Sequence, residues 1–487
     1  MPEIGDHYSP LAASEVRESE KKRICERNRQ LMMVTTFMYA LIQSMENSGI
    51  FDAYIYIVGG EKNTEVGFVA SIFGLSSLVL AMPAGWLIDN YSRAKLLSIG
   101  SVVLTAALLL YLYGVVTDNL ILLYVVFFIY GAQWVIQSSA SYSLFADSLP
   151  HGQRADAMST VSILQNVAGG TGPFLGVVLV HILGNEWQLP ILHRIIVIVG
   201  LVEFPTNWIN TLWRDVEHHE HADTNMSIKA GDAGVGETVE VKILTDSEKV
   251  ARLRAGYGWL VPYVISVNDI VTSVGAGMTI RYFPLFFMND YGFSPMQLQI
   301  LIGSYSIVIG ISTYLCNRTS KILGRVRACF LFAGIGTTCL YCLSSLYNLP
   351  ALLVVYFVRG GLQNAVYPLD RSLIMDYVVS KQRGKWNAVE SITAASWAGS
   401  AALGGWLCDG HDYRYAFSIT AHIYTIALLM RIPLFFLVRE NTGDPESAQS
   451  RRLLEDNKQS QSDRCYHMHC CELCSLHILL LSFPRAI

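Results

Sequence analysis

The chain has 487 residues, of which 52% are hydrophobic and 15% are charged. Soluble proteins carry about 25% charged residues, so this composition excludes an ordinary soluble protein and indicates one embedded in a lipid bilayer. The net charge of −4 adds little to this conclusion, and we expect no nucleic-acid partner.

Crossing the hydrocarbon core of a bilayer takes roughly 20 mostly apolar residues. The sequence contains twelve such runs, near residues 31–57, 65–88, 96–116, 119–144, 157–182, 190–213, 256–288, 294–316, 328–347, 351–376, 387–408 and 414–438. The residues before the first run are polar and charged, so we expect no cleaved signal peptide. These runs predict an all-α membrane protein with twelve transmembrane helices.

The distribution of lysine and arginine predicts the orientation of the helices. Basic residues precede the first run and fill alternate loops along the whole chain. The opposite loops contain only Lys62 and Arg414, with Arg194 just inside a helix. Because basic loops stay on the cytosolic side, we expect a multi-pass protein with both termini in the cytosol.

A long internal repeat relates the two parts of the chain. The stretch SLFADSLPHGQR, residues 143–154, returns as SLIMDYVVSKQR, residues 372–383. The same offset, 383 − 154 = 229 residues, pairs Gly131 with Gly360 and Gly176 with Gly405. An offset near half the chain length indicates two related halves rather than an array of short repeats.

These features divide the chain into five parts, listed in order. They are a cytosolic N-terminal tail (1–30), an N-terminal six-helix half (31–213), a cytosolic linker (214–255), a C-terminal six-helix half (256–438) and a cytosolic Cys-rich tail (439–487). The cysteines and histidines of the last tail match no standard zinc-site spacing, so we expect no bound metal there. Acylation of its cysteines is the alternative.

The loop after the second run, GWLIDNYSRAK, resembles the GxxxDRxGR signature of the major facilitator superfamily. Gly85, Asp89 and Arg93 match the signature, whereas Asn90 and Ser92 differ from it. Together with twelve runs, two repeated halves and internal termini, the resemblance implies the major facilitator fold, with two pseudo-symmetric six-helix halves.

The resemblance gives the repeated charges a role as an inner gate. In this family such charges bond between helix ends and between halves when the gate is shut, which implies gating by Asp147 and Arg154 and by their equivalents Asp376 and Arg383. The alternative is that these charges only mark the interface and orient the chain.

The signature residues belong to the same implied gate, with Arg93 among its charges. Gly85 would let helix 2 approach helix 11 closely, and Asp89 would face the positive N-terminus of helix 11. The corresponding loop of the second half is CNRTSKILGRVR, where Arg318 replaces the aspartate. We therefore expect a weaker second latch.

The fifth run contains AGGTGPFLGV, which resembles the antiporter motif GxxxGPxxGG of the same family. Gly172, Pro173 and Gly176 match, while Ala168 and Val177 differ. The resemblance implies exchange of a solute for protons. Close packing of small residues between helices is an equally good explanation.

Polar residues within the runs are candidates for the substrate or proton site, because charges inside a membrane are costly. A polar stripe with a spacing of four residues runs along the tenth helix. We expect the candidates to line a cavity between the halves. They are Glu46, Asn47, Gln133, Gln137, Gln165, Asn166, Asp269, Arg281, Arg359, Gln363 and Tyr367.

The best candidates for proton carriers are Glu46 and Asp269, because a carboxylate in an apolar cavity can change protonation near neutral pH. Arg281 or Arg359 could bind an anionic substrate or keep a carboxylate charged. The alternative is a fixed ion pair of Arg281 with either carboxylate, which would only hold helices together.

No catalytic motif occurs in the sequence, so we expect neither an enzyme nor a cofactor. The sequence predicts a monomeric secondary transporter that moves a small organic solute through the bilayer by alternating access, with proton antiport as the coupling mode. A non-transporting sensor on the same scaffold and a facilitative uniporter are the alternatives. The fold does not identify the solute.

Overall fold

The computed structural model describes residues 10–149, 154–216, 250, 253–254, 256–378 and 392–438, and the regular secondary structure of these residues is helical. The described residues up to Val438 belong to one compact unit. Most of the linker, the whole Cys-rich tail, Arg383 and the side chain of Arg154 lie outside the described residues. The predictions for these parts therefore stay predictions.

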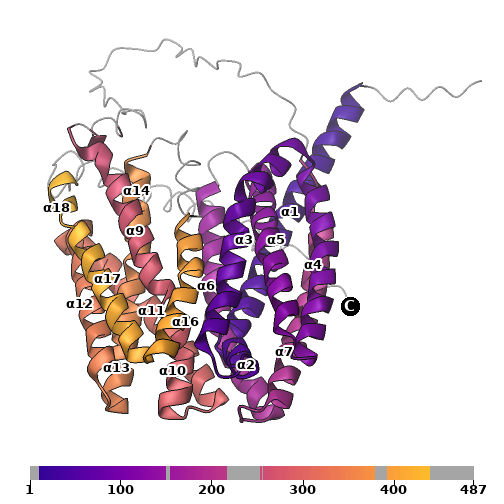
Figure 1. Cartoon of the computed structure of the whole chain (residues 1–487). Helices are drawn as coiled ribbons and strands as arrows, with labels where there is room; N and C mark the ends of the chain where they lie inside the picture. Colours follow the sequence, from indigo (N-terminus) through magenta and orange to yellow (C-terminus); the bar gives the residue numbers. More distant parts are fainter. Residues whose placement is uncertain are drawn as a thin grey trace, which may run out of the picture. The chain divides into compact units, whose positions relative to one another are not determined.

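The first half is built from seven α-helices and one short 3₁₀ turn among its described residues. They are α1 (Pro10–Glu46), α2 (Ile50–Val58), α3 (Asn63–Asn90), α4 (Arg93–Val116), α5 (Leu120–Asp147), α6 (Arg154–Leu183), α7 (Leu189–Ile209) and η1 (Asn210–Leu212). Figure 1 shows them side by side in one bundle, with α2 at the end opposite the start of α1.

The second half follows the same order. Its described elements are η2 (Gly258–Leu260), α9 (Val261–Gly277), α10 (Tyr282–Tyr291), α11 (Pro295–Leu323), α12 (Arg325–Ser345), α13 (Leu349–Ala365), α14 (Tyr367–Asp376), α16 (Ala401–Gly410), α17 (Tyr413–Met430) and α18 (Leu434–Leu437). Residues 392–399 are also helical and lead into α16.

Ten helical segments among the described residues are long and apolar enough to cross a membrane. The α1–α2 pair and the helix that ends at Gly410 complete two sets of six. The chain is an all-helical membrane protein, as its composition predicts.

The first predicted helix of each half is interrupted. Residues 47–49 separate α1 from α2, and residues 278–281 separate α9 from α10, so the first helix of each half breaks at an equivalent place. Gly49 has φ 87°, and a Cβ there would lie 2.6 Å from Cβ of Pro284. The break therefore requires glycine, both for its backbone conformation and for the close approach of the other half.

The first helix also begins earlier than predicted, at Pro10 instead of residue 31. Ion pairs form along the polar part of this helix that precedes the apolar run, where Lys22 pairs with Glu18 at 3.3 Å and Arg29 with Glu26 at 3.0 Å. Hydropathy detects only the apolar part of such a helix, because charged pairs at i+3 and i+4 support a helix without any apolar run.

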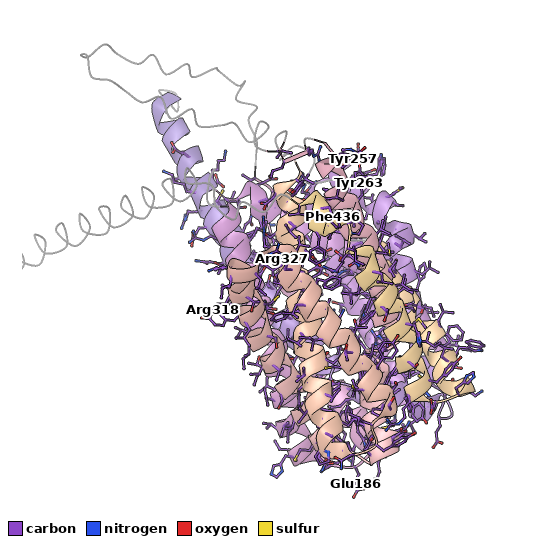
Figure 2. All side chains as sticks on the ribbon, turned by 90° about the vertical axis from the view of Figure 1, so that its left-hand side faces the viewer. Glu186, Tyr257, Tyr263, Arg318, Arg327 and Phe436 are labelled. Carbon is purple, nitrogen blue, oxygen red and sulfur yellow. The ribbon has the colours of Figure 1, made fainter. Side chains whose placement is uncertain are left out.

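Hydrogen bonds between the halves gather at one end of the bundle. Asp409 accepts hydrogen bonds from N and Nδ2 of Asn63 at 2.7 and 2.9 Å, and from N and Oγ1 of Thr64 at 2.8 and 2.5 Å. Arg281 pairs with Asp52 at 2.9 Å. We call this the closed end; α2 and α10 lie there in Figure 1, and Figure 2 labels Glu186 at the same end.

Asp409 provides the hydrogen-bond acceptor that the N-terminus of α3 lacks. The N-cap residue of α3, Lys62, makes no side-chain capping bond. Free N–H groups at a helix start need an acceptor and favour a negative charge. Asp409 from the second half fills that role, so the first half is capped by the second at the closed end.

Three helices show that the halves diverge away from this end. On α3, Gly67 and Gly74 pack so closely against Ala401 and Ala398 that a Cβ at either glycine would clash. Gly85 lies three turns further on the same face, and a Cβ there would meet no described atom within 4 Å. Among the described residues, the contacts of α3 with the second half are therefore confined to the part before Gly85.

The contact between α6 and α11 becomes looser towards the same end, where a Cβ at Gly170 would lie 4.0 Å from Cβ of Ser306. Gly176 packs against Gln299, whereas Gly169, two turns away on the same face, has no described neighbour within 4 Å of a built Cβ. On α11, Gly303 packs against Phe174, and Gly310 again has none among the described residues. We call the opposite end, where α1 begins and α14 ends, the open end.

Candidate functional site

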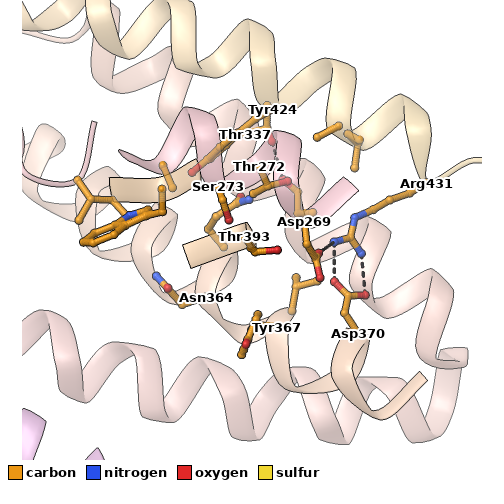
Figure 3. A pocket seen from close by; sticks show the side chains of 18 of the residues that line it. Asp269, Thr272, Ser273, Thr337, Asn364, Tyr367, Asp370, Thr393, Tyr424 and Arg431 are labelled. Atoms are coloured by element: carbon orange, nitrogen blue, oxygen red, sulfur yellow. Dashed lines mark hydrogen bonds and ion pairs between the residues drawn. The ribbon is translucent and has the colours of Figure 1, made fainter. Parts of the chain in front are cut away.

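A cavity of about 220 Å³ lies within the second half. Figure 3 shows the polar side chains that surround it, contributed mainly by α9, α13, α14 and α17. Asn364 and Tyr367 at its margin are exposed. The cavity is thus a polar space inside an otherwise apolar bundle, open on one side.

Four predicted site residues meet in this cavity. Asp269, Arg359, Gln363 and Tyr367 all line it, and the last three form the stripe predicted along the tenth helix. That helix is divided into α13 and α14 at Val366, but the break leaves the stripe on one side. The other predicted substrate or coupling residues do not line this cavity.

Beside the cavity, Arg431 holds two carboxylates. Its guanidinium donates to both oxygens of Asp370 at 2.9 and 2.6 Å, and one of its nitrogens lies 4.0 Å from Asp269 (Figure 3). A buried bidentate pair of this kind has strong geometric specificity. The sequence analysis missed Arg431 because it lies near the end of an apolar run. Basic residues commonly flank membrane helices at such positions without any role in a site.

Arg281 has a different partner from those considered in the sequence. It pairs with Asp52, and neither Asp269 nor Glu46 bonds to it among the described residues. Its guanidinium also lies 5.6 Å from the ring of Trp397. Asp52 and Arg281 are separated by the repeat offset of 229 residues. The repeat register could therefore have identified this pair, because equivalent residues meet at a two-fold interface.

In the first half, α1 and α7 run in opposite directions and share a row of polar residues. Tyr39 donates its hydroxyl to Oδ1 of Asn207 at 2.8 Å, and Nδ2 of Asn210 donates to Tyr39 at 2.8 Å. Glu46 follows Tyr39 by seven residues, and Glu203 precedes Asn210 by seven. Since seven residues make about two turns, both glutamates lie on the shared face at the same level.

The described surroundings of these two carboxylates hold few groups that could balance their charge. Glu46 is influenced first by its burial and then by the negative charge of Glu203. Nδ2 of Asn207 donates to Glu203 at 3.4 Å. Tyr111 of α4 and Tyr130 of α5 face both glutamates, and the Tyr130 hydroxyl is buried without a partner among the described residues.

The remaining polar candidates of the first half are scattered. Gln133 is buried against Gly100 of α4, whereas Gln137 is half-buried. Gln165 donates to the hydroxyl of Tyr142 at 3.2 Å, and its side chain is exposed. Asn47 and Asn166 are exposed as well. Their roles in substrate binding or coupling stay predictions.

The predicted gate residues whose side chains the structure describes lie at the open end. Arg93 pairs with Asp147 within the first half. Arg325 pairs with Asp376 at 2.6 Å within the second half. The second half thus has its own ion pair at the corresponding place despite its altered signature. Asp89 is exposed, and a Cβ at Gly85 would meet no described atom within 4 Å. The N-terminus of helix 11, which both residues are expected to face, lies outside the described residues.

The residues of the antiporter-like motif make close helix contacts. A Cβ at Gly172 would clash with Oγ of Ser44 on α1, and one at Gly176 would lie 2.5 Å from Oε1 of Gln299 on α11. Pro173 lies between them inside α6. Gly405, the repeat partner of Gly176, likewise packs against the other half, where a Cβ would lie 2.5 Å from the carbonyl oxygen of Asn63.

Comparison with known proteins gives a family match. The model of the Major Facilitator Superfamily matches residues 32–259 and 265–480. No curated protein matches the chain significantly. Among solved structures, a bacterial homologue of the human lysosomal transporter Spinster, in an inward-facing and unoccupied conformation, has a TM-score of 0.60 at 13% identity, covering 85% of this chain and 99% of its own.

Two further structures show the same fold. The peptide transporter POT, in complex with sulfate, has a TM-score of 0.59 at 13% identity, with coverage of 86% of this chain and 99% of its own. The nucleoside transporter NupG has a TM-score of 0.58 at 11% identity, with coverage of 84% and 99%. At these identities the likeness concerns the fold alone.

Proposed function

The chain belongs to the Major Facilitator Superfamily and is a membrane transporter rather than an enzyme, and we propose that it couples transport of a small solute to protons through Glu46 and Glu203. The single observation that carries this proposal is the pair of carboxylates on the shared face of α1 and α7, of which Glu203 is buried and Glu46 is half-buried. Solute movement itself would follow from alternating access of the two halves.

Alternating access is supported by the difference between the two ends. The closed end is joined by Asp409 and by the Asp52–Arg281 pair, whereas the contacts of Gly85, Gly169 and Gly310 with the other half are missing among the described residues at the open end. Because basic loops stay on the cytosolic side, we assign the open end to the cytosol. In this proposal the conformation is inward-open.

Closure of the open end would use the predicted gate. The Arg93–Asp147 and Arg325–Asp376 pairs fasten neighbouring helix ends within each half. Each half would then move as a rigid body, so that Gly85 and Asp89 come to face the second half. In this proposal the four paired charges keep the halves rigid, and the glycine face of α3 is the surface that closes.

The proton site rests on charge and burial together. Among the described residues, no arginine, lysine or histidine pairs with Glu46 or Glu203, and the side chains that face them are Tyr39, Tyr111 and Tyr130. Two neighbouring carboxylates without a cation, one buried and one half-buried, cannot both stay charged at low cost inside a membrane. In this proposal the pair shares one exchangeable proton.

A test without any solute is available. In reconstituted protein, the infrared band of a protonated carboxyl group should appear and disappear with pH. Glu46→Gln and Glu203→Gln should each change the pH range of this titration, and the double variant should abolish it. Glu65→Gln is the matched control, because Glu65 lies in the same half and is bonded by Tyr124.

Coupling itself is tested by flux into proteoliposomes. A panel of labelled sugars, amino acids, carboxylates and nucleosides is offered with and without a pH gradient. The proposal predicts accumulation that follows the gradient and is lost in either glutamine variant, while exchange at equal pH persists. Gradient-independent flux would instead identify a facilitator. Solute binding without any flux would identify a sensor.

A further inference from the structure

The cavity of the second half contains a buried cation that lacks a counter-ion. Arg359 is 1% exposed and lines the cavity. Its two terminal nitrogens donate to the hydroxyls of Tyr305 and Tyr424 at 3.4 Å each, which is longer than a normal hydrogen bond. Its Nε has no partner, and no carboxylate of the described residues lies within ion-pair distance.

Two other buried arginines of the same half show that this arrangement is unusual. Arg431 is neutralised by Asp370. Arg414 donates to the carbonyl oxygens of Leu343 and Leu346 at 3.1 and 2.5 Å. Both guanidinium groups are therefore satisfied by the protein itself. The guanidinium of Arg359 instead rests on aromatic faces, with Phe283 at 5.1 Å.

A second unsatisfied group lies next to Arg359. Gln363 follows it by one helical turn on α13, lines the same cavity, and has a buried Oε1 without a partner among the described residues. Side-chain amides can be turned to present either the oxygen or the NH₂ group. A guanidinium and an amide on one face of a helix are groups that bind a carboxylate and a neighbouring polar atom.

We propose that this cavity is the substrate site and that it binds a small organic monocarboxylate, with Arg359 on the carboxylate and Gln363 on an adjacent hydroxyl or carbonyl. This names the substrate class of the transporter proposed above and rests on that function. Burying an unpaired cation is costly in any protein, and within a membrane such a residue marks a binding site or pathway.

Charge and size narrow the substrate further. The four charged residues of the cavity, Arg359, Arg431, Asp269 and Asp370, carry two positive and two negative charges. One bound negative charge is attracted by Arg359, but a second would meet the aspartates. The volume of about 220 Å³ also lies below the range of roughly 300–1,000 Å³ that holds drug-sized ligands.

The test compares each carboxylate with its uncharged amide on the purified full-length protein. Lactate and glycerate should raise the melting temperature, whereas lactamide and glyceramide should not. Glycerol phosphate should stabilise less than glycerate because of its extra charge. Equal stabilisation by acid and amide, or stronger stabilisation by the phosphate, would overturn the assignment.

Variants then assign the effect to Arg359. Arg359→Gln should lose the response to carboxylates, and Arg359→Lys should retain part of it, because the charge remains while the planar fork is lost. Arg318→Gln removes an exposed arginine of the same half and should respond like the wild type. A full response in Arg359→Gln would refute the site.

The outcome is separable from that of the proton proposal. Stabilisation by carboxylates concerns the second half and needs no gradient, whereas the infrared titration concerns Glu46 and Glu203 and needs no solute. If carboxylates fail to stabilise the protein while the infrared titration is observed, the substrate site is wrongly assigned. If the titration is absent while carboxylates stabilise the protein, the proton site is wrongly assigned.

Discussion

The two halves share a fold and a repeat, yet the interior charges that lack an ion-pair partner are opposite in sign. The first half holds Glu46 and Glu203 without a paired cation, and the second holds Arg359 without a paired carboxylate, among the residues described. The repeat offset places Tyr130, which faces the glutamates, at the position equivalent to Arg359. Equivalent positions of the two halves thus hold a tyrosine beside two carboxylates in the first half and an arginine in the second.

Together with the two proposals above, this difference suggests how two ligands would be coupled. A proton on the glutamate pair and a carboxylate on Arg359 would each neutralise a charge that lacks an ion-pair partner. The loaded transporter then carries less uncompensated charge, and its sites are easier to seal from water than those of the empty protein. Such a scheme favours symport of proton and anion. The exchange implied by the motif on α6 is not required, because its glycines are explained by packing contacts.

The strongest way to test the difference between the halves is to remove a carboxylate from the second one. Asp370→Asn leaves Arg431 buried without its bidentate partner, and removal of one member of a buried pair costs about 3–5 kcal/mol. Thermal unfolding of the purified protein should report a large loss of stability. Asp376→Asn breaks an exposed pair and should cost less than about 1 kcal/mol. Equal effects of the two variants would contradict the assigned burial.

The next largest effect is expected at the closed end. Asp409→Ala removes the acceptor of four hydrogen bonds that cap α3 from the other half, and bonds to a charged group contribute about 1.5–3 kcal/mol each in favourable cases. The closed end should open more often.

Maleimide labelling of the buried Cys408, in a variant whose other cysteines are replaced by serine, measures this opening. Labelling should be faster in Asp409→Ala than in the parent. The matched control is Asp412→Ala, which removes a neighbouring aspartate that caps its own helix, α17. Unchanged labelling in Asp409→Ala would show that the capping bonds do not hold the halves together.

Much of the fold was accessible from the sequence because its signals are local. Apolar runs gave the spans, and the repeat gave the two halves. The four-residue spacing of Arg359, Gln363 and Tyr367 correctly placed them on one face. These patterns depend on helical periodicity and burial, which each segment carries by itself.

The sequence did not show which residues of the two halves pair with each other. Asp52 meets Arg281 and Asp409 meets Asn63 only because the halves pack at the closed end, hundreds of residues apart in the chain. The helix breaks at residues 47–49 and 278–281 were missed for a related reason. A break stabilised by the opposite half leaves little trace in the hydropathy of its own segment.

A smaller effect distinguishes the closed from the open part of one helix. Gly74→Ala inserts a methyl group directly against Cβ of Ala398, and overpacking of this kind typically costs about 1–3 kcal/mol. Gly85→Ala meets no described atom and should leave thermal stability nearly unchanged. It should instead slow transport, because Gly85 must pack against the second half when the open end closes. Equal melting temperatures for the two variants would mean that the halves do not diverge along α3.

The smallest expected effect on stability is at Glu203, and its sign separates the halves. Glu203→Gln removes a buried carboxylate that faces Glu46 and has no cation to leave unpaired among the described residues. Its loss relieves repulsion instead of creating an isolated charge, so the melting temperature should stay constant or rise slightly. A clear loss of stability in Glu203→Gln would reveal a cationic partner for Glu203. The carboxylates of both halves would then be paired with cations, and the difference between the halves would disappear. An unchanged or raised melting temperature, beside the loss in Asp370→Asn, would show that the carboxylates of the second half hold the fold whereas those of the first are available for function.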